Sequence, residues 1–114
     1  MPKNKFLKDV ILCLKKHEIE CMPKGAPNPK TGDYYNYQLK AKNDIFHISK
    51  NCNVYKIKLD KSCNSDDVAN AIIETVSMRY SQSNHDEAKQ IIHELYDLKN
   101  EYNIKPSLIY GVVD

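Results

Sequence analysis

Three consecutive stretches in the middle of the chain alternate between polar and apolar residues: YYNYQLKAK, IFHISK and NVYKIKL, within residues 34–59. A period of two is typical of β-strands that bury one face. The pairs Asn43-Asp44 and Asn51-Cys52 separate the stretches, and Asn and Asp tolerate the positive φ of two-residue turns. We therefore predict a three-stranded antiparallel meander.

Two such turns fix a register for this meander. Lys40 is then opposite His47, and His47 is opposite Lys56, all on the polar face. Leu39, Ile48 and Tyr55 would share the apolar face, and a slip of one residue in any strand would turn its apolar set toward water. The consistent sorting of side chains supports the predicted register.

Helical patterns flank the meander. Leu7, Val10, Ile11 and Leu14 recur at the spacing of one buried stripe, which predicts a helix that is capped by Asn4 and runs to about His17. A second helix is expected from a cap at Asn64 to about residue 81. A third should start near residues 83–84 and end no later than residue 106.

The expected order is α(β)βββαα, a two-layer α+β fold in one domain over residues 1–114. The optional strand is the short stretch 19–22. The following stretch 23–33 holds three prolines and two glycines and is expected to be a surface loop. The apolar tail at 108–112 is expected to be an edge strand or a packed strap.

The chain has no run of about 20 apolar residues, so we expect no membrane contact. The N-terminal apolar run is broken by Lys8 and Asp9 and makes a poor signal peptide. The four cysteines contain no CxxC pair, and without a secretory signal free thiols are expected. We therefore expect a cytoplasmic protein. Its oligomeric state is left open.

Charge is distributed unevenly along the chain. Residues 1–61 carry 13 Lys against six acidic residues, a net charge of +7, whereas residues 62–114 carry four basic against nine acidic residues, a net charge of −5. Exposed strand lysines can bind phosphates, but they also keep sheet edges soluble. The predicted nucleic-acid or anion-binding residues are Lys24, Lys30, Tyr34, Lys40, Lys42, His47, Lys56 and Lys58.

Catalytic and metal sites find little support. Cys13, His17 and Cys21 are spaced at i, i+4 and i+8, but the helix is expected to end before Cys21, which leaves Cys13 buried and His17 at the surface. The sequence also lacks a Gly-rich phosphate loop and the clustered carboxylates of a metal-dependent nuclease. We expect no enzyme activity, no catalytic residues, no cofactor and no bound metal ion.

Two functional hypotheses remain. The first is a non-enzymatic binding module that uses the basic sheet face to bind nucleic acid or an acidic protein partner. The high content of Lys, Asn and Ile suggests a low-GC bacterium or its mobile elements.

The second hypothesis is a phage- or plasmid-encoded inhibitor or immunity-type protein. Its order α-βββ-αα resembles that of a small anti-CRISPR protein, which implies binding to one large protein. That partner would be bound through acidic residues: Asp86, Glu87, Glu94, Asp97 and Glu101.

Overall fold

The computed structural model describes residues 4–42, 54–81, 85–104 and 111–113. Along the chain these residues form α1 (Lys5–Lys16), β1 (Ile19–Lys24), β2 (Asn36–Ala41), β3 (Val54–Lys58), α2 (Ser65–Tyr80), α3 (Asp86–Glu101) and β4 (Gly111–Val113). The predicted α+β class is confirmed, with one N-terminal helix, an antiparallel meander and two C-terminal helices. Within the described part of the chain, none of the helices is long and apolar enough to span a membrane.

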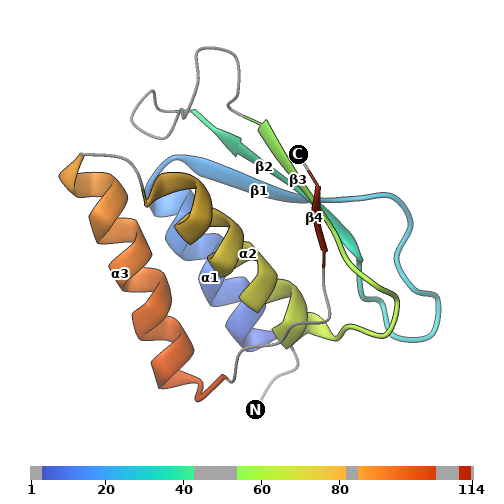
Figure 1. Cartoon of the computed structure of the whole chain (residues 1–114). Helices are drawn as coiled ribbons and strands as arrows, with labels where there is room; N and C mark the ends of the chain where they lie inside the picture. The colour runs from blue at the N-terminus through green and yellow to red at the C-terminus, as the bar shows by residue number, and fades with distance from the viewer. Residues whose placement is uncertain (1–3, 43–53, 82–84, 105–110, 114) are drawn as a thin grey trace.

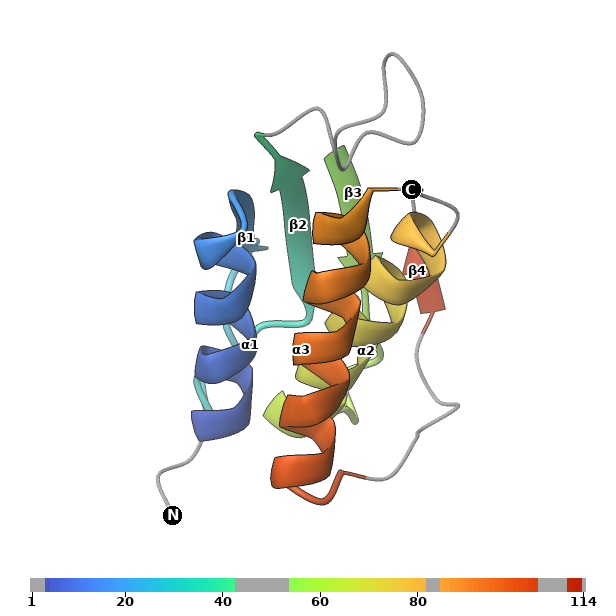
Figure 2. The same ribbon diagram turned by 90° about the vertical axis from the view of Figure 1, so that its left-hand side faces the viewer.

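The three helices all lie on one side of the sheet. Figures 1 and 2 show α1 and α2 against the sheet and α3 over the groove between them. This position explains why α2 is buried almost all round, whereas α1 buries a single stripe that includes Leu7, Val10 and Leu14. The opposite face of the sheet carries no described helix.

The sheet has the strand order β1-β2-β3-β4, and every neighbouring pair is antiparallel. The predicted register was wrong. β2 lies between β1 and β3, so Lys40 is opposite Glu20 on one side and Val54 on the other, and not opposite His47. The predicted strand at 45–50 and both predicted turns lie outside the described residues.

The three helices differ in how their N-termini are capped. Asn64 caps α2 as predicted: its side chain accepts a hydrogen bond from the Asp67 amide, and the Asp67 side chain accepts one from the Asn64 amide. Asn4 precedes α1, but its φ of 72° is left-handed and its side chain makes no cap hydrogen bond, so its predicted capping role was wrong. α3 begins at Asp86 after His85, slightly later than predicted.

The core joins the inner face of the sheet to the helices. Tyr55 on β3 meets Tyr80 on α2 edge to face, with ring centroids 6.0 Å apart. Phe6 on α1 packs against Tyr102 just after α3, with centroids 5.2 Å apart. These contacts tie the first and last helices into one core, which leaves the outer sheet face as a separate surface.

Candidate nucleic-acid interface on the sheet

The outward side chains of three strands make up a surface that we call the sheet face. The predicted alternation is confirmed for β2 and β3, because Leu39, Ala41, Tyr55 and Ile57 are buried and their neighbours are not. The sheet face consists of Glu20, Met22, Lys24, Asn36, Gln38, Lys40, Val54, Lys56 and Lys58. Strand pairing arranges these side chains in three rows.

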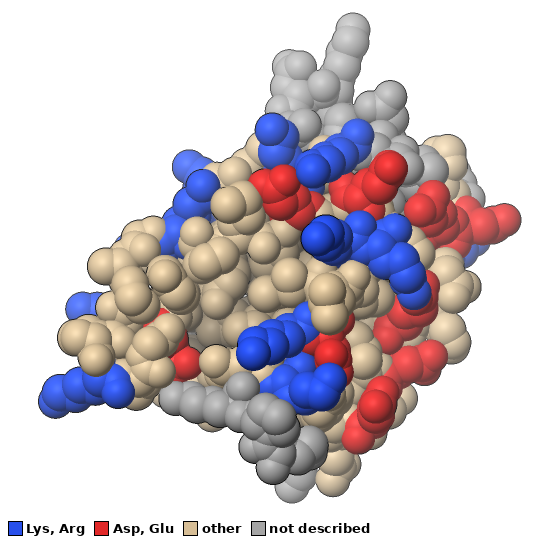
Figure 3. Space-filling model, turned by 180° about the vertical axis from the view of Figure 1, so that it is seen from behind, with Lys and Arg blue, Asp and Glu red and all other residues tan. Residues whose placement is uncertain are grey.

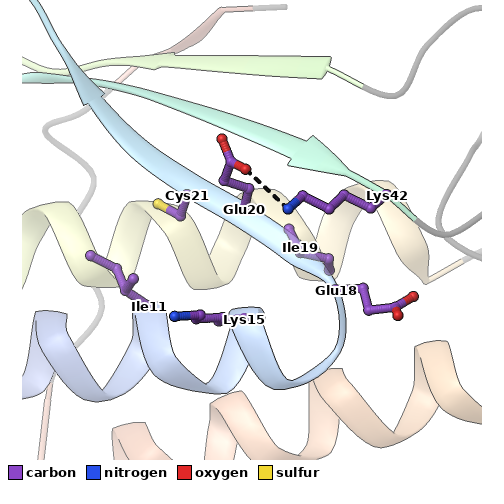
Figure 4. Close-up of a pocket in the computed structure, with 7 residues that line it drawn as sticks. All are labelled: Ile11, Lys15, Glu18, Ile19, Glu20, Cys21 and Lys42. Carbon is purple, nitrogen blue, oxygen red and sulfur yellow. Dashed lines mark ion pairs between the residues drawn. The ribbon is translucent and has the colours of Figure 1, made fainter.

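The first row runs Glu20–Lys40–Val54 and is nearly neutral. Lys42 follows β2, and its Nζ lies 3.3 Å from Oε2 of Glu20, so the same carboxylate faces two lysines. Figure 4 shows the Lys42 side chain reaching toward Glu20 on β1. Lys40 and Lys42 are exposed as predicted, but Glu20 offsets part of their positive charge.

The other two rows contain no acidic residue. They run Met22–Gln38–Lys56 and Lys24–Asn36–Lys58. Lys56 and Lys58 are two residues apart on one strand, so their Cα atoms lie roughly 7 Å apart, and Lys24 lies two strand spacings from Lys58, about 10 Å. We call Lys24, Lys56 and Lys58 the basic end of the sheet face.

A hollow lies at this basic end. Its volume is about 450 Å³, and the basic end lines it together with residues 36–38 and Ile57. Two of the lining side chains, Asn36 and Gln38, carry amide groups that can donate and accept hydrogen bonds. Three ammonium groups and two amides therefore surround one concave surface, which suits an anion with several oxygens.

Two predicted site residues occupy different places. Tyr34 is half-buried, packs against the hydrophobic core and lies before β2, outside the three rows. Lys30 is exposed on the loop between β1 and β2, where its amide donates to Oδ1 of Asn28 at 2.8 Å. His47 lies outside the described residues.

A second hollow of about 280 Å³ lies between α1 and β1 (Figure 4). Lys15, Glu18 and Glu20 line it beside the Glu20–Lys42 ion pair, so its charges largely offset one another. Burial raises the pKa of the Cys21 thiol in its wall to about 12, which leaves that sulfur protonated and unreactive. This hollow offers neither a net charge nor an activated nucleophile.

The acidic side chains predicted to bind a protein partner do not form one free surface. Figure 3 shows acidic side chains gathered along the side where α3 lies, while Lys and Arg side chains spread around an uncharged central area. Asp86, Asp97 and Glu101 are exposed. Glu87 and Glu94 instead face α1, where both contact His17.

His17 is the residue that sequence reasoning placed wrongly. It was expected at the surface, yet its exposed fraction is 8%, and its ring lies between α1 and α3. The spacing of Cys13 and His17 placed them on one side of a helix. The glutamates that they face lie about 70 or more residues further along the chain, so no local pattern indicated this contact.

No protein-family model, curated protein or solved structure matches this chain significantly.

Proposed function

We propose that the protein binds double-stranded nucleic acid through the sheet face, mainly by contacts between the basic end and the phosphate backbone. This proposal rests on the second and third rows of the sheet face, which contain no acidic residue. Together they place Lys24, Lys56 and Lys58 around one hollow. Phosphate contacts by lysine release condensed counterions and supply affinity without regard to base sequence.

The chemistry of these side chains favours weak sequence preference. A lysine ammonium is a compact point charge, whereas bidentate reading of guanine edges is best served by the planar fork of arginine. The amides of Asn36 and Gln38 lie between the lysines and can donate to phosphate or sugar oxygens. These contacts would hold the nucleic-acid backbone in place without reading the base sequence.

A duplex fits the sheet face better than a single strand. Non-specific single-strand binders stack bases on exposed aromatic side chains. The nine residues of the sheet face include no aromatic residue, and Tyr34 packs against the core. The lysines offer charge without a stacking platform, which suits a backbone whose bases are already paired.

Charge reversal tests the proposal. We expect the double variant Lys56→Glu/Lys58→Glu to weaken binding to a short random-sequence DNA duplex by at least about tenfold, because it replaces attraction with repulsion at the basic end. Fluorescence anisotropy at fixed low salt measures the change. The control Lys89→Glu/Lys61→Glu makes the same change in net charge at exposed residues off the sheet face and should cost much less.

The two double variants separate local from global charge effects. An equal loss in both would mean that only net charge matters, and a sheet-face variant that binds as tightly as the wild type would refute the proposal. Failure of the wild type to bind duplex DNA or RNA would refute it as well. Circular dichroism and thermal melting establish that both variants are folded.

A further inference from the structure

Three potential metal ligands from distant parts of the chain meet where α1 packs against α3. Cys13 and His17 lie one helical turn apart on α1, and Glu94 projects from α3. The thiol sulfur, an imidazole nitrogen and a carboxylate oxygen all lie within 4.8 Å of one another. His17 is buried, and the other two are half-buried, so the group is recessed from solvent but reachable.

The two ring nitrogens of His17 face different carboxylates. Nε2 is 2.7 Å from Oε2 of Glu94, and Nδ1 is 3.4 Å from Oε1 of Glu87. Carboxylates only accept hydrogen bonds, so the ring is held from both sides by acceptors. The other oxygen of Glu94 accepts a hydrogen bond from the exposed Lys16 ammonium.

We propose that Cys13 Sγ, His17 Nε2 and Glu94 bind one Zn²⁺ ion, with water as the exchangeable fourth ligand. A mixed sulfur, nitrogen and oxygen set suits the borderline-soft Zn²⁺ ion better than Mg²⁺ or Ca²⁺, which prefer oxygen ligands. Three protein ligands and one open position are the pattern of accessible zinc sites. A hollow of about 420 Å³ lined by Cys13, Lys16 and Glu94 gives that fourth position access to water.

Small movements bring the ligands to zinc geometry. Zinc bonds of about 2.0–2.3 Å place tetrahedral ligand atoms about 3.3–3.6 Å apart. The contact between Nε2 and Oε2 of Glu94 must therefore open by about 0.6 Å, and a pair of ligand atoms at the 4.8 Å limit must close by about 1.2 Å. Lys16 does not hold Glu94 rigidly, because 63% of its side chain is exposed and it can turn into solvent.

Glu87 has the position of a supporting residue. When Nε2 binds a metal, Nδ1 keeps its proton and can donate it to a carboxylate, which fixes the ring and raises its basicity. Glu87 lies on that side of His17 at 3.4 Å. The structure thus contains the carboxylate–histidine pair that commonly accompanies zinc.

Charge balance favours the bound state. On binding, a Zn–S bond replaces the S–H bond and the proton passes to solvent. The thiolate and the Glu94 carboxylate then offset the two positive charges of the ion, which leaves a neutral site between the helices.

Metal titration of the full chain tests the site. We expect one equivalent of Zn²⁺ by isothermal titration calorimetry under reducing conditions. With Co²⁺ as the probe, we expect a thiolate-to-cobalt charge-transfer band and the intense visible bands of tetrahedral cobalt. The band should disappear in Cys13→Ser, a nearly isosteric change, and Glu87→Gln should weaken Zn²⁺ binding by about 10- to 100-fold.

Matched controls distinguish this site from surface binding. His93→Gln and Asp66→Asn remove an imidazole and a carboxylate at exposed positions that do not line the hollow at this site, and both should bind Zn²⁺ as the wild type does. Unchanged Zn²⁺ affinity in Cys13→Ser, absence of the charge-transfer band in the wild type, or equal losses in the controls would each overturn the proposal. Duplex binding by the sheet face does not involve these residues, so the two proposals fail independently.

Discussion

The sheet face and the contact between α1 and α3 use charged residues in opposite ways. On the sheet face, the lysine side chains are exposed and point away from the core. Between the helices, His17 is buried and bonded to Glu94, 77 residues along the chain. Charge on the sheet face is therefore free to act on a partner, whereas charge at the helix contact also contributes to the fold.

Removing His17 should give the largest loss of stability. We expect His17→Ala to lower the free energy of unfolding by about 2 kcal/mol, because it leaves a small cavity and deprives Glu87 and Glu94 of a shared partner. Urea denaturation in the presence of a chelator measures the loss without any contribution from bound metal. The comparison variant Lys58→Ala should stay within about 0.5 kcal/mol of the wild type. Equal losses in the two variants would contradict this division of roles.

A smaller effect is expected from Glu20. Glu20→Gln removes the carboxylate that faces Lys40 and pairs with Lys42, so the first row becomes positive like the other two. We expect binding to a DNA duplex to tighten by about threefold, the range of one exposed ion pair. Competition anisotropy against the wild type measures this change, and Asp86→Asn on α3 is the control with the same change in net charge. Weaker binding by Glu20→Gln would show that the first row is not part of the interface.

Local sequence patterns predicted the elements well. The helical stripes and the Asn64–Asp67 capping box depend on neighbours within a few residues, and so does the division of strand residues between two faces. Strand partners depend on distant residues. The alternation of 45–50 predicted a strand between 34–42 and 53–59, yet β2 pairs directly with β3 on one side and with β1 on the other. β1 is an edge strand, which tolerates Pro23 despite its missing amide proton.

The candidate sites show the same limit. Periodicity placed Lys40, Lys56 and Lys58 on the exposed face, but it did not reveal that Glu20 faces Lys40 or that Lys24 shares a row with Lys58. Likewise, the spacing of Cys13 and His17 indicated one side of a helix, while the carboxylates that complete the cluster come from a helix about 70 residues later.

The salt dependence of duplex binding tests the central claim most directly. If Lys24, Lys56 and Lys58 each neutralise one phosphate, they contribute roughly −2.7 to the slope of log Kobs against log salt concentration for a DNA duplex. The triple variant with Gln at these three positions should therefore have a slope that is less negative than that of the wild type by about 2.7. An unchanged slope in the triple variant would contradict the account, because the phosphates would then be bound elsewhere on the molecule.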